Sequence, residues 1–216
     1  MLYTPPAFKI DDLNTLHDHI EKTGLALLIT TGATGPLASH VPLLLERHAG
    51  PFGTLIGHLA RANMQASQSK TDHEALIVFQ GPDAYISPNW YPTKQEHGRV
   101  VPTWNYAVVH ARGTIKFFDD PVLLHSAVDR LTNRHEAQFA KPWATSDAPK
   151  AYMDGQLKGI IGFEIQIQSL EGKHKLSQNR SKADQSGVIT GLSTSENPAD
   201  ASVAELMKQP TFNRPE

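Results

Sequence analysis

The sequence predicts a mainly β fold with peripheral helices, an antiparallel barrel of the Greek-key type rather than an alternating α/β sheet. Three observations favour it: about six or seven segments have strand character, short turns join them, and only a few amphipathic segments intervene. The 216 residues are enough to bury a full core. We expect one domain over residues 1–192 and a polar C-terminal tail over residues 193–216.

The first half of the chain alternates turns with apolar segments. Asp11 or Asp12 can cap a helix that runs to Lys22. A hairpin and a third strand follow, and "RANMQASQSK" then opens a short helix after a loop. The predicted strands are "LALLITT" (25–31), "LASHVPLLLE" (37–46) and "TLIGHLA" (54–60).

The second half of the chain contains longer predicted strands and helices. "EALIVFQG" and "DAYISP" are predicted as another strand pair, "NWYPTKQEHGRVVP" as a long polar loop, and "TWNYAVVHARGTIKFF" (103–118) as the longest strand. Asp119, Asp120 and Pro121 start a helix to about Gln138. "APKAYMDGQL" predicts a shorter helix and "GIIGFEIQIQSL" the last core strand. The tail after Leu192 is expected to be poorly ordered or to lie on a partner.

Composition excludes several classes of protein. The formal net charge is -2 and the pI about 6.6, which gives little electrostatic basis for wrapping nucleic acid. The absence of cysteine excludes disulfides, zinc-thiolate sites, Fe–S clusters and thiol catalysis. No signal peptide, membrane span or metal-site motif is recognised, so the expected localisation is cytoplasmic and no metal is expected.

Residues 57–65, "GHLARANMQ", place a cation and a helix cap at the end of a strand. Free backbone N–H groups at a helix start, joined by the Arg61 guanidinium, can bind an anion such as phosphate. The alternative is that Asn63 only caps the helix and Arg61 is a solvated charge.

Two tryptophans, Trp90 and Trp104, flank the long polar loop, with Thr103 and Asn105 beside the second. A planar side chain and neighbouring amides suit a flat heteroaromatic ligand. Aromatic residues near strand ends are equally common as core and rim residues, and that alternative stays open.

The segment "EGKHKLSQNRSK" (171–182) follows the last predicted strand with cations, amides and hydroxyls and almost nothing apolar. Lys173 and Lys175 share one face of that strand, and His174 and Leu176 share the other. Such a segment suits a polar, anionic small molecule. A solvated strand end followed by "SKAD" as a helix cap is the alternative.

These segments, in their order, resemble the PaiB-like family of FMN-binding negative transcriptional regulators. The resemblance covers roughly Met1 to Leu192. It is carried by "YTPPAFKIDD", "SHVPLLLE", "GHLARAN", "VFQGPDAYISPNWY", "VPTWNYAVVHARGTI", "GFEIQIQSLEGKHKLSQNRS" and "GVITGL". It implies a split β-barrel of the pyridoxamine-phosphate-oxidase type, built as a homodimer with FMN in clefts between the subunits.

The resemblance also implies positions for the FMN site. Ser39, His40 and Pro42 would line the flavin, while His58, Ala60, Arg61 and Asn63 would hold the phosphate and ribityl chain. Gln80 would reach the flavin ring. The cleft would be completed by Trp104, Asn105, Lys175, Ser177, Gln178, Asn179 and Arg180, from the same subunit or its partner.

Three functions remain open at this point. The family implies a repressor, although no helix-turn-helix is recognised and the tail carries few cations for DNA. A flavin-dependent oxidoreductase acting on a small molecule, without direct DNA contact, is the alternative. A haem-handling relative, with His40, His58 or His110 as axial ligand, is a third, and no catalytic residue is assigned.

Overall fold

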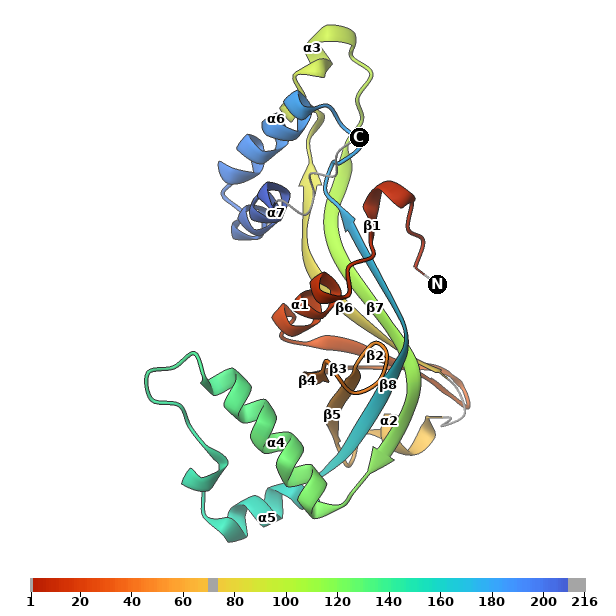
Figure 1. Cartoon of the computed structure of the whole chain (residues 1–216), viewed down its shortest axis with the longest axis vertical. Helices are drawn as coiled ribbons and strands as arrows, with labels where there is room; N and C mark the ends of the chain where they lie inside the picture. Colours follow the sequence, from red (N-terminus) through yellow and green to blue (C-terminus); the bar gives the residue numbers. More distant parts are fainter. Residues whose placement is uncertain (1, 70–73, 210–216) are drawn as a thin grey trace. The chain divides into compact units, whose positions relative to one another are not determined.

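The computed structural model describes residues 2–69 and 74–209 (Figure 1). Within these residues an eight-stranded sheet has the order β3-β2-β6-β7-β8-β5-β4, and β1 pairs with β8. The strands are β1 (Lys9–Ile10), β2 (Ala26–Gly32), β3 (Gly35–Val41), β4 (Leu43–Glu46), β5 (Thr54–Ala60), β6 (Glu74–Ile86), β7 (Thr103–Phe118) and β8 (Ile160–Lys175).

The helices interrupt the strands at the points where the sequence loses its alternation. They are α1 (Leu13–Lys22), α2 (Met64–Gln68), α3 (Thr93–His97), α4 (Pro121–Glu136), α5 (Lys150–Lys158), α6 (Lys182–Ser193) and α7 (Pro198–Lys208), with short 3-10 turns η1 (Pro6–Phe8), η2 (Pro88–Trp90) and η3 (Thr145–Asp147). In the part of the chain that is described, no helix is both long and apolar enough to cross a bilayer.

The chain divides into two compact units, which are described separately. The first comprises Met1–Asp12, Gln80–Val109 and Glu171–Glu216, and the second comprises Leu13–Phe79 and His110–Leu170. Because the division falls within β6, β7 and β8, each of these strands contributes residues to both units.

The second unit contains the curled part of the sheet. β2 pairs antiparallel with β3 and with the start of β6, and β5 pairs antiparallel with β4 and β8. Pro42 separates β3 from β4, and β3 also contacts β5, so the sheet curls without a ladder between its end strands β3 and β4 among the described residues. Alternate residues of β2 and β5 are buried, which gives this curl an apolar interior.

Helices α1 and α4 both pack on β4 of the second unit. Helix α1 buries Leu16 and Ile20, and α4 buries Leu124, Ala127 and Leu131. Helix α4 begins as predicted at Asp120, whose carboxylate accepts hydrogen bonds from the backbone N–H groups of residues 122 and 123.

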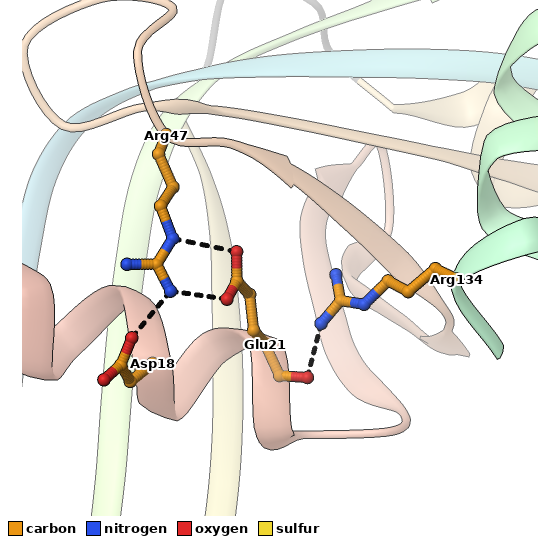
Figure 2. Close-up of polar contacts among 4 residues, drawn as sticks. All are labelled: Asp18, Glu21, Arg47 and Arg134. Carbon is orange, nitrogen blue, oxygen red and sulfur yellow. Dashed lines mark hydrogen bonds and ion pairs between the residues drawn. The ribbon is translucent and has the colours of Figure 1, made fainter. Parts of the chain in front are cut away.

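An ion-pair cluster fastens α1 to its neighbours (Figure 2). Arg47, just after β4, donates from Nε to Glu21 Oε1 at 2.9 Å and from a terminal nitrogen to Glu21 Oε2 at 2.5 Å. That terminal nitrogen also donates to Asp18 Oδ1 at 2.6 Å. Arg134 of α4 donates to the backbone oxygen of Glu21. The forked Arg47–Glu21 contact therefore ties the end of α1 to the segment after β4, and the Arg134 contact ties it to α4.

The first unit has a core of its own, built where α6 and α7 pack on each other and on the ends of long strands. Its buried residues come from β6, the loop after η2, the end of β8 and both helices. They are Ala84, Ile86, Tyr91, Leu176, Val188, Leu192, Val203 and Ala204.

Three local predictions require correction. The expected strand pair around residues 74–88 is one continuous strand, β6. Pro82 lies beyond the residues of β6 that pair with β2, Leu76–Val78, so its missing N–H removes no hydrogen bond to β2. The polar loop contains α3, which ends at Gly98 with φ 66°. The single strand expected over residues 37–46 is two strands, β3 and β4, separated at Pro42.

The tail also differs from expectation. Residues 198–208 form α7, in which Val203 and Ala204 are buried against α6. The expectation of a poorly ordered tail is therefore wrong for α7, because its apolar side chains complete the core of the first unit. Residues 210–216 lie outside the described part of the chain.

Candidate functional site

The polar segment after β8 is a tight turn between that strand and α6. Ser177 has φ 66°, the left-handed region that residues with a Cβ seldom adopt. The Gln178 side chain accepts from Leu176 N–H at 2.7 Å and donates to the backbone oxygen of His174 at 2.6 Å. Ser181 then accepts from Asp184 N–H and caps α6. The sequence "LSQNRS" thus reverses the chain while satisfying its own backbone.

This turn lines a small pocket in the first unit, with a cavity volume of about 120 Å³. The start of β7 supplies the opposite wall. The lining residues are Tyr91, Val101, Pro102, Thr103, Asn105, Lys175, Ser177, Asn179 and Arg180. Five of the predicted site residues, Asn105, Lys175, Ser177, Asn179 and Arg180, therefore lie around one cavity.

Polar contacts fix the floor of this pocket. Asn105 is completely buried and Ser177 is nearly so, and the Asn105 amide nitrogen lies 3.0 Å from the Ser177 hydroxyl. Lys175 Nζ donates to Thr103 Oγ1 at 2.7 Å and to the backbone oxygen of Trp104. Arg180 lies over the Tyr91 ring, 4.8 Å from its centroid.

The pocket is cationic. Lys173, one strand repeat before Lys175, is buried between the rings of Tyr3 and Tyr106 and donates to the backbone oxygen of Tyr3 at 3.0 Å. Among the described residues, no carboxylate pairs with Lys173, Lys175 or Arg180. Burial, and then the charges of Lys173 and Arg180, lower the pKa of Lys175.

The two candidate tryptophans have different roles. Trp90 packs against α6, where a Cβ at Gly187 or Gly191 would lie within 2.4 Å of a Trp90 atom. Trp104 is 53% exposed and meets the ring of Tyr85 edge-on, with centroids 5.9 Å apart. Of the two, only Trp104 is open to a ligand, because Trp90 is used in helix packing.

The second group of predicted residues lies in the second unit. Asn63 caps α2 as predicted, accepting from Gln65 N–H at 2.9 Å, and its amide nitrogen donates to the Ser39 hydroxyl at 2.9 Å. The buried Gln65 side chain donates to the backbone oxygen of Leu28 and to Thr30 Oγ1. These contacts hold α2 on β2 and β3 and bring Ser39 and Asn63 together.

Arg61 is not directed at the α2 cap. Its Nε donates to the backbone oxygen of Lys158 at 3.0 Å, and a terminal nitrogen lies 3.8 Å from Asp119. It lines another cavity, of about 290 Å³, with Asp119, Pro121, Leu124, Asp154, Leu157 and Lys158. Because this cavity carries both signs of charge, it does not favour a dianion as the first pocket does.

The remaining predicted residues occupy strand ends. His40 is exposed on β3, Pro42 follows that strand, and Ala60 is exposed at the end of β5. His58 is half-buried on β5 with an unpartnered Nδ1, and burial lowers its pKa. Gln80, on β6, is exposed and belongs to the first unit.

The candidate set drawn from the sequence left out two residues that shape the cationic pocket. Tyr91 holds Arg180 by its ring, and Lys173, two residues before Lys175 on β8, adds to the local positive potential. Tyr91 directly follows Trp90, so the sequence "NWY" could have indicated an aromatic residue in the pocket lining. The contact of Arg180 with Tyr91 was not predictable, because it depends on the turn at Ser177.

Comparison with models of protein families shows to which family the chain belongs. Residues 2–169 match the model of the family described as "Putative FMN-binding domain". The chain belongs to this FMN-binding family. FMN is accordingly its cofactor, and the predicted relationship to PaiB-like proteins is confirmed.

Similar proteins extend over most of the chain. It is 31% identical to the protease synthase and sporulation protein PAI 2 of Bacillus subtilis over 207 residues, covering 96% of this chain and 97% of that protein. It is 34% identical to an uncharacterized protein of Emericella nidulans, covering 84% of this chain and 87% of that one.

Solved structures with low sequence identity establish the fold. The flavocytochrome Anf3 of Azotobacter vinelandii has a TM-score of 0.53 at 10% identity, covering 77% of this chain and 69% of that one. The FAD and heme binding protein of Mycobacterium smegmatis has a TM-score of 0.54 at 13% identity, covering 77% and 73%. The predicted split-barrel fold of this FMN-binding protein is thereby confirmed.

The residues present suit FMN chemically. The phosphate is a dianion near neutral pH, and the first unit offers a half-buried lysine, an arginine and hydroxyl groups without a neighbouring carboxylate partner in the described chain. The exposed Trp104 offers an aromatic surface next to this pocket, since its backbone oxygen binds Lys175. When bound, FMN supplies electron-transfer chemistry that no side chain here provides.

Proposed function

We propose that this FMN-binding protein is a PaiB-type negative transcriptional regulator of the cytoplasm that uses bound FMN as its input signal. The observation that carries FMN recognition is the cationic pocket formed by Lys175 and Arg180 in a chain of this family. Support for the regulatory role comes from the PaiB resemblance and from the similarity to the B. subtilis sporulation protein along 96% of the chain.

The proposed site keeps all the residues named from the sequence and is formed in a homodimer, with FMN in the subunit interface. Within this set Ser39 and Asn63 contact each other, and their hydroxyl and amide suit a ribityl chain. The full proposed set is Ser39, His40, Pro42, His58, Ala60, Arg61, Asn63, Gln80, Trp104, Asn105, Lys175, Ser177, Gln178, Asn179 and Arg180.

Titration of the purified, ligand-free protein with FMN tests this proposal. We expect saturable quenching of flavin fluorescence with one FMN per chain. Trp104→Leu should weaken binding by about tenfold, since an aromatic stacking contact contributes roughly 0.5–1.5 kcal/mol beyond the area it buries. Trp143→Leu is the matched control, because Trp143 is also exposed but lies in the other unit and outside the proposed set.

The homodimer is tested by measuring the molar mass in solution by light scattering, with and without FMN. We expect two chains per particle. A monomer that still binds FMN with unchanged affinity on dilution would remove the interface from the proposed site.

A flavin-dependent oxidoreductase without direct DNA contact is the second candidate. It is favoured by the net charge of -2, which supplies little of the attraction that DNA binding requires. Salt-sensitive retardation of DNA from upstream of the gene supports the regulator. Rapid bleaching of protein-bound FMN by NAD(P)H, with no DNA retardation at low salt, supports the oxidoreductase.

A further inference from the structure

We propose that the pocket between the start of β7 and the β8–α6 turn is a phosphate subsite, specific for the terminal phosphate of a phosphate monoester. This proposal extends the proposed function. It depends on FMN binding only in identifying which compound supplies the phosphate. It moves phosphate recognition from the Arg61–Asn63 segment to Lys175, Ser177 and Arg180.

The size of the pocket favours a single group rather than a whole ligand. Its volume is about 120 Å³, whereas cavities that enclose an entire drug-sized molecule usually span roughly 300–1,000 Å³. The larger part of the ligand would then lie outside the pocket, as in a phosphate carried by a chain. The lining is polar on the floor, with Asn105 and Ser177, and cationic on the walls.

Charge favours a dianion over a monoanion. Lys175 and Arg180 both line the pocket, and the buried Lys173 adds to the positive potential at Lys175. Asp184, at the start of α6, is buried and is already held by Thr93, whose hydroxyl donates to its carboxylate at 2.9 Å. These three cations, which have no carboxylate partner within residues 2–69 and 74–209, repel one another, and an entering dianion offsets that repulsion.

The geometry also keeps the donors in place before a ligand arrives. Lys175 is oriented by Thr103 and by the backbone oxygen of Trp104, and Arg180 is oriented by the Tyr91 ring. The backbone of Ser177 is held in a left-handed conformation that turns Asn179 and Arg180 toward the pocket lining. Strain and unpaired charge are commonly retained where a ligand repays them.

Arg61 is the competing candidate, and its contacts argue against it. Its guanidinium already donates to the Lys158 backbone oxygen and lies near Asp119, so a phosphate would have to compete with a carboxylate. In the described part of the chain no carboxylate pairs with Arg180, whose guanidinium lies over the Tyr91 ring.

The test measures phosphate binding by the ligand-free protein and the two variants Lys175→Met and Arg180→Gln. Inorganic phosphate should raise the melting temperature above that in sodium chloride of the same ionic strength, and both variants should lose this rise. Lys175→Met should also melt higher than the wild type in chloride, because it removes a repelled, half-buried charge. Lys208→Gln, which removes an exposed lysine paired with Glu205, is the charge-matched control and should keep the phosphate response.

Paired titrations with FMN and riboflavin identify the source of the phosphate. If FMN supplies it, the wild type should bind FMN at least about tenfold more tightly than riboflavin, phosphate should compete with FMN, and both variants should lose the preference. If a separate phosphorylated compound supplies it, phosphate should bind equally well to the FMN-loaded protein, and the variants should keep their FMN affinity. Either result supports the subsite.

Two outcomes overturn the subsite. One is a phosphate response no greater than that of chloride together with an unchanged preference for FMN over riboflavin in both variants. The other is loss of that preference in Arg61→Ala while Arg180→Gln retains it. Failure of FMN binding alone is distinguishable, because the melting-temperature response to inorganic phosphate is measured without flavin.

Discussion

Ser177 combines a left-handed backbone with a buried hydroxyl that contacts Asn105. The two features have opposite effects on stability, and two substitutions separate them. Ser177→Ala keeps the strained backbone and leaves the Asn105 amide short of a partner, which should cost about 1–3 kcal/mol. Ser177→Gly also loses the hydroxyl but relieves a backbone cost of roughly 1–2 kcal/mol, so it should be the milder change.

Urea unfolding of the two Ser177 variants measures this difference. Gly24→Ala is a suitable reference for a glycine–alanine exchange in a turn, because nothing lies within 4 Å of the added Cβ and its φ is not positive. An alanine variant as stable as the glycine variant would mean that Ser177 relaxes out of the left-handed region in solution.

The Arg47–Glu21 pair predicts a pH-dependent contribution to stability. The hydrogen bonds from Arg47 hold the pKa of Glu21 below its ordinary value. The stabilisation is therefore present above the unfolded-state pKa of Glu21 and is lost as the pH falls through the lower folded-state value. Because both side chains are about one third exposed, we expect Arg47→Met to cost only about 1 kcal/mol at neutral pH.

Urea unfolding of wild type and Arg47→Met at neutral pH and near pH 3 tests this prediction. The difference between the two proteins should shrink in acid, as Glu21 becomes protonated and its bonds to Arg47 are lost. Lys150→Met, which breaks the exposed pair with Asp154 on α5, should change stability by much less. A gap that is equally large in acid would show that Arg47 acts through packing rather than charge.

At the scale of the element, α6 depends on two glycines that admit Trp90. A Cβ at Gly187 would lie 2.0 Å from the Trp90 backbone oxygen, and one at Gly191 would lie 2.4 Å from its ring. Gly187→Ala and Gly191→Ala should each destabilise the first unit by about 1–3 kcal/mol, the usual cost of overpacking.

The matched control is Gly155→Ala on α5, where nothing lies within 4 Å of the added Cβ. That substitution should instead stabilise the protein by about 0.5–1 kcal/mol, because alanine favours a helix interior. Tryptophan fluorescence during unfolding reports both effects. Stabilisation by all three alanines would mean that α6 does not pack on Trp90.

Elements with strong local signals were predictable from the sequence. Strands β5 and β7 have the predicted bounds, and α4 begins at its predicted cap, because alternation and capping are decided by neighbouring residues. The continuation of β6 through Pro82 was not predictable, since it depends on which residues of β6 pair with neighbouring strands. The pairing of β8 with β1 at Lys173 was likewise not predictable, because the two strands are distant in sequence.

At the scale of the whole molecule, the sequence identified the family and the chemical character of its polar segments. It could not say which polar groups were already occupied. Gln178 is used to close the β8–α6 turn, and Arg61 is bound by the end of α5, whereas Lys175 and Arg180 border one cavity. The contacts of Gln178 are local, whereas those of Arg61 and Lys175 join residues more than 70 positions apart, as between Lys175 and Thr103.

The docking of α7 has a practical consequence for anyone preparing shorter versions of this protein. The family match ends at residue 169, and the recognisable sequence resemblance stops at Leu192. Leu192 therefore looks like a natural end point for a truncated protein. Removal of residues 193–216 would remove Val203 and Ala204 from the core that they share with Val188 and Leu192, and would expose an apolar surface to water. Such a fragment should aggregate or be degraded by proteases, whereas a fragment that ends after Gln209 should remain in solution.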